Sequence, residues 1–77
     1  MIVMPGFVDA HWHLWSTIFR NLLRVDRGYF DLLRGLANHF NPEDFYHSCL
    51  LALSEATNAG ITTILNFSHN TRSPAHA

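Results

Sequence analysis

Two histidines separated by one residue, His11 and His13, are the side chains of this sequence best suited to chemistry. They follow a short run, Phe7-Val8-Asp9-Ala10, that predicts a β-strand. Because side chains alternate across a strand, both imidazoles would point to one face, about 6–7 Å apart along the chain. Two imidazoles at that spacing can share one metal ion. The alternative is a pair of polar residues at a solvated strand end.

A strand, a long helical crossover and a second strand are predicted around this pair. Pro5 and Gly6 introduce the first strand, expected over about residues 6–11. The crossover covers about residues 16–59, and the β-branched run at about 61–67 predicts a buried parallel strand. Parallel strands joined by helices make an α/β fold, in which functional residues gather at the carboxyl ends of the strands. The histidine pair lies at such an end.

Helical segments are expected within the crossover. Ser16 or Thr17 would cap a short first helix, and a break is predicted at residues 26–28. The last helix should begin after Asn41, a good N-cap, with Pro42 in its first position. Apolar residues recurring at helical spacing predict the buried face of this helix. They are Phe45, Cys49, Leu50, Leu53, Ala56 and Thr57, and Gly60 should end the helix.

Residues 5–14 closely resemble the first barrel strand of the amidohydrolase superfamily, whose form is P-G-[FL]-[VI]-[DN]-x-H-x-H. Residues 59–65, Ala-Gly-Ile-Thr-Thr-Ile-Leu, are similar to its second strand, A/S-G-[VI]-T-T. Arg20 falls where the chlorohydrolase and aminohydrolase branch, which includes cytosine deaminase-like and triazine hydrolase-like enzymes, often has an arginine. The resemblance implies the first βαβ portion of a (β/α)8 barrel. Since such a barrel takes about 250 residues, residues 1–77 are expected to be a partial barrel domain, and the chain a fragment.

The resemblance also implies a metal-dependent reaction. His11 and His13 would be the two first-strand ligands of one divalent ion, zinc or iron. A bound ion lowers the pKa of its water and supplies hydroxide, which would hydrolyse a C–N or C–Cl bond of a small cyclic substrate. The family's other ligands and its proton shuttle come from later strands. We therefore assign no catalytic residue within the chain and expect the isolated chain to be inactive.

Four further side chains are candidates for the same site. Trp15 would stack on a flat heterocycle, or else pack in the core. Arg20 would bind a substrate carboxylate or carbonyl, or else form a structural ion pair. His69, at the carboxyl end of the second strand, would contact substrate or serve as a third ligand of the fragment. Asp9, below the histidines on the same face, would accept a hydrogen bond that orients an imidazole or a neighbouring strand, or be a buried structural hydrogen-bond partner.

Composition narrows the class of protein. Five arginines, no lysine and a net charge of −1 give no basic patch, so we expect no nucleic-acid partner. No apolar run reaches the roughly 18 residues that a membrane span needs, so no membrane partner is expected. Cys49 is the single cysteine, which fits a reducing compartment and predicts a cytoplasmic protein.

Three alternatives remain open from the sequence. The first is a ring hydrolase like dihydroorotase or imidazolonepropionase, which the stretch from Leu14 to Arg20 fits less well. The second is a small histidine-rich module that binds a metal or a protein without catalysis. The third is a homo-oligomer in which copies cover each other's apolar faces and open sheet edges.

Overall fold

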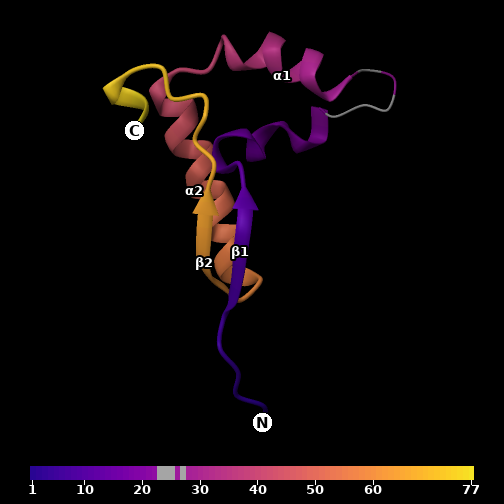
Figure 1. Cartoon of the computed structure of the whole chain (residues 1–77), viewed down its shortest axis with the longest axis vertical. Helices are drawn as coiled ribbons and strands as arrows, with labels where there is room; N and C mark the ends of the chain where they lie inside the picture. Colours follow the sequence, from indigo (N-terminus) through magenta and orange to yellow (C-terminus); the bar gives the residue numbers. More distant parts are fainter. Residues whose placement is uncertain (23–25, 27) are drawn as a thin grey trace.

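Two parallel strands joined by a helical crossover form the frame of the chain (Figure 1). The structure, a computed structural model, describes residues 1–22, 26 and 28–77. The α/β class is confirmed, whereas Arg27, in the predicted break at 26–28, lies outside the described residues. In chain order the elements are β1 (Phe7–Trp12), the 3₁₀ helix η1 (Leu14–Leu22), α1 (Tyr29–Ala37), α2 (Pro42–Asn58), β2 (Ile61–Asn66) and the 3₁₀ turn η2 (Pro74–His76).

The two strands start their pairing where the chain passes closest to itself. Phe7 pairs with Ile61, and the next pair along the ladder skips Thr62, which is an extra residue of β2. Gly6 faces that residue so closely that a Cβ on it would lie 2.1 Å from the Thr62 Cγ2 atom. A glycine before the first strand is therefore required by contact with the second strand.

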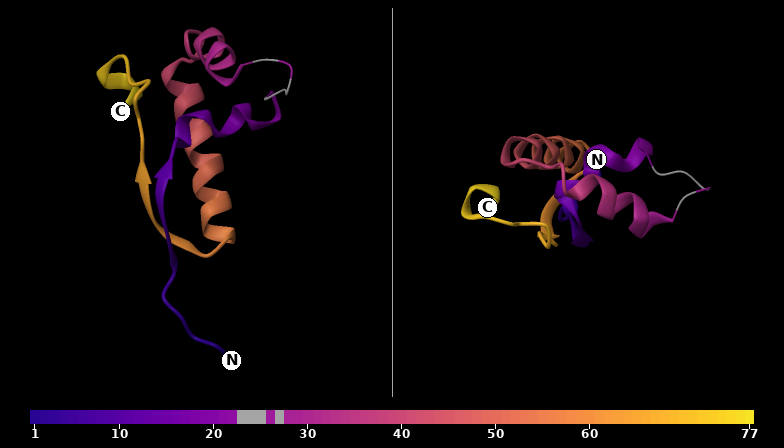
Figure 2. Two further views of the ribbon diagram at one scale, coloured as in Figure 1. Left: turned by 45° about the vertical axis from the view of Figure 1, so that its right-hand side comes forward. Right: turned by 90° about the horizontal axis from the view of Figure 1, so that it is seen from above.

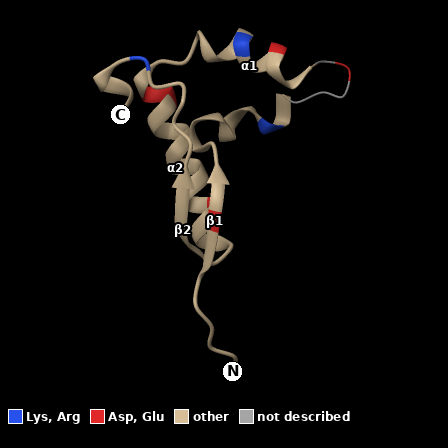
Figure 3. Cartoon of the chain, in the orientation of Figure 1, with Lys and Arg blue, Asp and Glu red and all other residues tan. Residues whose placement is uncertain are grey.

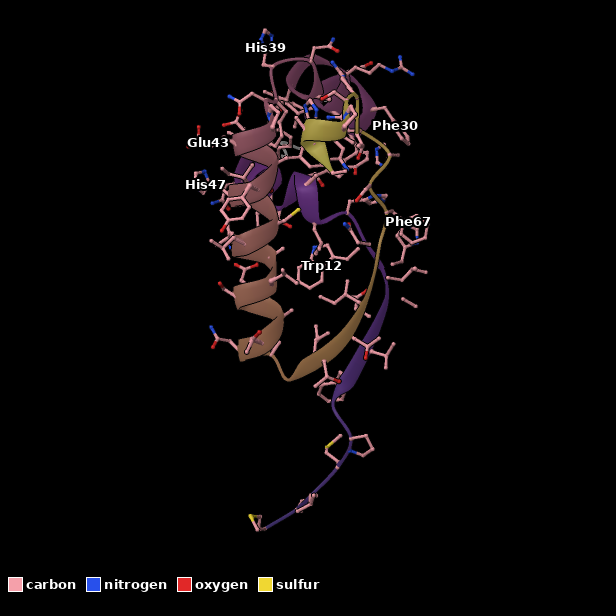
Figure 4. The ribbon with its side chains drawn as sticks, turned by 90° about the vertical axis from the view of Figure 1, so that its left-hand side faces the viewer. Trp12, Phe30, His39, Glu43, His47 and Phe67 are labelled. Atoms are coloured by element: carbon pink, nitrogen blue, oxygen red, sulfur yellow. The ribbon has the colours of Figure 1, made fainter. Side chains whose placement is uncertain are left out.

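The helix α2 lies along one side of the two strands (Figure 2). Trp12 points from β1 toward α2, whereas Phe67, just after β2, points to the opposite side (Figure 4). That opposite side is open, and Leu65 is 58% exposed. The prediction of a buried second strand is therefore wrong for this chain, because the described residues cover one face of the sheet and leave the other uncovered.

The buried face of α2 agrees with the prediction at Phe45 and Ala56 and differs from it elsewhere. It is formed by Phe45 and the small residues Ser48, Ala52 and Ala56, four positions apart. Small side chains allow the helix to pack close to η1 and the strands, so they are buried in place of larger apolar residues. Leu50, predicted to be buried, is 49% exposed. Among the other predicted members, Leu53 and Thr57 are exposed, and Cys49 is half-buried, which raises the pKa of its thiol.

An aromatic core lies beyond the carboxyl ends of the strands, between η1 and the start of α2. Trp15 stacks on Phe45 with ring centroids 5.8 Å apart, and Phe19 and Phe40 complete the cluster. Part of α1 also packs against it through Leu33, Leu36 and Ala37. Burial of these large side chains is the main apolar contribution to stability that the structure shows.

The helix η1 begins earlier than predicted, at Leu14. Ser16 is not its cap, since both the main-chain N–H and the hydroxyl of Ser16 donate to the carbonyl of His13 at 3.1 Å. Ser48 of α2 fixes this segment from the other side. Its buried hydroxyl donates to the Leu14 carbonyl (3.0 Å) and accepts from the Ile18 N–H (3.3 Å).

The ends of α2 form as predicted from local sequence. The Asn41 side chain accepts from the N–H of Asp44, and the Asp44 carboxylate accepts from the N–H of Asn41, which makes a capping box. Pro42 occupies the first turn. Gly60 has a positive φ of 76°, the conformation that a glycine after a helix readily adopts.

Charged side chains gather mainly at the end of the molecule that holds η1, α1 and the start of α2 (Figure 3). The strands and the N-terminal segment carry few charged side chains. Within the described ranges, no helix combines the length and the apolar character needed to cross a membrane.

We expect replacement of Asn41 by alanine to lower the free energy of unfolding by about 1 kcal/mol, because an N–H at the helix start loses its acceptor. Urea unfolding followed by circular dichroism measures the change. Asn41→Ser, which keeps an acceptor oxygen, is the control and should retain most of the stability. If the free energy of unfolding fell equally in both variants, the hydrogen bond from the Asp44 N–H would not be what stabilises the start of α2.

Candidate metal centre

The two histidines of the H-x-H motif converge at the carboxyl end of β1. The Nε2 atoms of His11 and His13 are 3.3 Å apart, and the ring centroids are 5.1 Å apart. His11 is exposed and His13 is half-buried, so solvent reaches the pair. Both rings contact the ring of Phe67, which lies on the side of the sheet away from α2 (Figure 4).

A bulge in β1, between Asp9 and Trp12, contains His11. The strand takes three residues from Asp9 to Trp12, whereas its partner takes two from Ile64 to Asn66. The N–H of His11 donates to Asp9 Oδ1 at 2.9 Å. The half-buried Asp9 thus holds the main chain of His11, a predicted ligand. This hydrogen bond is to the main-chain N–H and not to the imidazole ring.

Phe67 fixes both imidazoles, and sequence reasoning missed it. Its carbonyl lies 3.1 Å from His13 Nδ1, and its ring stacks on His11 with centroids 4.2 Å apart. A carbonyl oxygen only accepts, so the Nδ1 atom of His13 carries the proton and its Nε2 atom keeps a lone pair. Phe67 directly follows β2, so its position next to the end of β1 could have indicated a contact with the histidines.

His69 joins the pair as an aromatic neighbour. Its ring centroid is 4.9 Å from that of His13 and 5.2 Å from that of Trp15, with both pairs of rings nearly perpendicular. Across the described ranges, no group of three or more His, Cys, Asp or Glu side chains is arranged to hold a metal ion. The structure therefore brings His69 to the site but does not make it a third ligand.

Trp15 lies in the core and not at a binding surface. Its side chain is 1% exposed and is enclosed by Phe19, Phe40 and Phe45. The suggestion that it stacks on a substrate is therefore corrected, because its ring faces are occupied by protein side chains. Its indole N–H has no hydrogen-bond partner within the described part of the chain.

Arg20 forms the structural ion pair that the sequence left open as an alternative, and its partner, Glu55 of α2, is the residue that sequence reasoning missed. One guanidinium nitrogen donates to Glu55 Oε2 at 2.7 Å and the other to Oε1. These hydrogen bonds, and then the charge of the carboxylate, raise the pKa of Arg20. Both residues line a cavity of about 340 Å³ that His11 and His13 also line. Arg20 therefore forms a structural ion pair and also lies at the margin of the predicted site.

The histidine pair fits two ligand positions of a divalent ion. Two nitrogens, each about 2.0–2.1 Å from a tetrahedral zinc ion, would be about 3.3–3.4 Å from each other. The Nε2 atoms of His11 and His13 are 3.3 Å apart. The His13–Phe67 hydrogen bond leaves the correct nitrogen free, as the outer partner of a metal-bound histidine usually does.

Comparisons with known proteins identify two relatives of the chain. The chain is 37% identical to a 5-methylthioadenosine/S-adenosylhomocysteine deaminase of Acetivibrio thermocellus over 65 residues, covering 80% of this chain and 15% of that protein. It is 34% identical to a protein of the same name from Lawsonia intracellularis over 70 residues, covering 86% of this chain and 16% of that protein. No solved structure matches the chain significantly.

The chain thus spans about one sixth of the length of these curated relatives. A sequence model of the amidohydrolase family matches residues 2–77, which is nearly every residue. The resemblance stated from the H-x-H strand is confirmed, and the chain belongs to the amidohydrolase family, in its deaminase-like branch.

Proposed function

We propose that this chain supplies the first two metal ligands of a hydrolase with a (β/α)8 barrel. The observation that carries the proposal is the 3.3 Å separation of His11 Nε2 and His13 Nε2 at the carboxyl end of β1. Barrel enzymes gather their active sites at that end of the strands. The open face of β1 and β2, on which both imidazoles contact Phe67, would be the barrel interior.

The residues of the chain would prepare the ligands before a metal arrives. Asp9 sets the main chain of His11, and the Phe67 carbonyl fixes the tautomer of His13. A bound zinc or iron ion would lower the pKa of a coordinated water toward neutrality and so supply hydroxide. Since imidazole suits both metals, the two ligands favour neither.

The reaction class follows from the relatives. Both curated relatives are named as deaminases of 5-methylthioadenosine and S-adenosylhomocysteine. We propose hydrolysis of a C–N bond in a small cyclic substrate, ahead of the C–Cl alternative. His69 and Arg20 are proposed substrate contacts, because His69 adjoins His13 and Arg20 lines the cavity beside the pair. Arg20 would then bind substrate while still paired with Glu55.

The remaining ligands and the proton shuttle would come from other strands of a barrel. Since the described residues bring no third metal-binding side chain to the pair, we propose that residues 1–77 alone bind a metal weakly and do not turn over substrate. A reducing, cytoplasmic location is proposed from the single, half-buried Cys49.

Zinc titration of the chain tests the proposal. We expect zinc to bind through the Nε2 atoms of His11 and His13, because their separation already matches a shared ion. Competition with a chromophoric chelator measures the affinity, and ¹⁵N spectra of labelled histidine identify the bound nitrogens. The double variant His11→Ala/His13→Ala should lose this binding.

The matched control removes two histidines elsewhere. His39 and His47 are exposed, and in Figure 4 His47 lies on the side opposite Phe67 and His39 at the top of the molecule, away from Phe67. His39→Ala/His47→Ala should therefore keep the zinc affinity of the unchanged chain. Equal affinity in the two double variants would overturn the assignment of the ligands and favour a non-specific histidine-rich module.

Replacement of Asp9 separates positioning from charge. Asp9→Ala removes the acceptor for the His11 main-chain N–H, and we expect zinc affinity to fall by up to about tenfold, because a direct partner of a ligating imidazole typically accounts for about 10- to 100-fold and Asp9 acts only through the main chain. Asp9→Asn keeps an acceptor oxygen and should lose less. The same titration measures both variants. Equal losses would mean that the negative charge, and not the hydrogen bond to the main chain, supports the site.

A further inference from the structure

The segment after β2 turns back onto the junction between α1 and α2. Asn70 is 8% exposed, and its Nδ2 atom donates to the carbonyl of Ala37 at 3.3 Å. Arg72 donates from Nε to Asn70 Oδ1 at 3.1 Å and from a terminal nitrogen to Asn38 Oδ1 at 2.8 Å. Three hydrogen bonds thus connect residues 70–72 with the end of α1 and with each other.

These contacts are suited to holding the segment in one place. Ala37 ends α1, where carbonyls lack the usual helical partner and accept from other groups. The amide of Asn70 uses both its donor and its acceptor, which is how a buried amide avoids the cost of desolvation. The Arg72 guanidinium spans two acceptors with a rigid, planar group.

His69 directly precedes Asn70 in the chain. Its ring contacts the rings of both His13 and Trp15. Within the described part of the chain, the His69 side chain makes no hydrogen bond, so side-chain bonding does not fix its ring. Asn70 is its neighbour in the chain, and Trp15 is immobilised in the core. The main chain around His69 is held on one side at Phe67, whose N–H donates to the Trp12 carbonyl at 2.8 Å, and on the other side at Asn70.

We propose that Asn70 and Arg72 are positioning residues that hold His69 against His13, the proposed metal ligand. The role of His69 as a substrate contact beside His13 rests on the proposed function. The geometry rests on the hydrogen bonds that join Asn70 and Arg72 to the end of α1, and on the peptide bond between Asn70 and His69.

The test is nuclear magnetic resonance of the 77-residue chain, without metal or substrate. Nuclear Overhauser contacts from the His69 ring to the His13 and Trp15 rings report the proposed position directly. Asn70→Asp retains the size of the side chain and the acceptor for Arg72 but has no donor for Ala37. We expect the His69 contacts to be lost in Asn70→Asp and in Asn70→Ala, and the Trp15–Phe45 core contacts to remain.

Two further variants make the result decisive. Asn58→Ala removes an exposed asparagine from the end of α2 and should leave every His69 contact unchanged. Arg72→Ala removes an exposed side chain without entering the core, so it decides the question if an Asn70 variant fails to fold. It should weaken the His69 contacts to both rings.

Persistence of the His69 contacts in Asn70→Ala and Arg72→Ala would overturn the proposal, as would their absence from the unchanged chain. The zinc titration is a separate measurement. If zinc binding does not depend on His11 and His13 while the His69 contacts do depend on Asn70, the proposed metal function fails and the positioning role stands.

Discussion

The parallel pairing of β1 with β2 is the constraint on which the site depends. It brings the carboxyl ends of both strands to one edge, so that the first residue after β2 meets the histidines at the end of β1. Phe67 then serves both rings, accepting from His13 and stacking on His11. Without the second strand, the histidine motif would remain in the sequence, but neither imidazole would be held.

Features encoded by neighbouring residues were predictable from the sequence. The capping box of Asn41 and Asp44 and the positive φ of Gly60 depend on atoms within a few positions, so residue types suffice to predict them. The α/β order and the family also follow from short patterns, and both are confirmed. The convergence of His11 and His13 follows in part from the period of a strand.

Features set by distant partners were not predictable. The buried face of α2 is decided by how closely the helix approaches η1 and the strands, and that distance selects Ser48 and Ala52 over Leu50. The ion pair of Arg20 joins residues 35 positions apart. The bulge after Asp9 depends on the register with β2. In each case the sequence offers several partners, and tertiary packing chooses one.

The separation of the strands along the chain has a consequence for folding order. The hydrogen bond between His13 and Phe67 closes a loop across 54 positions, whereas the hydrogen bonds of α2 form within single turns. Closing a long loop costs chain entropy before any contact repays it, so topologies rich in such pairings fold slowly. The histidine pair would therefore assemble after the helix that spans the loop. A change that slows closure would delay the site while leaving the helix content of the chain nearly intact.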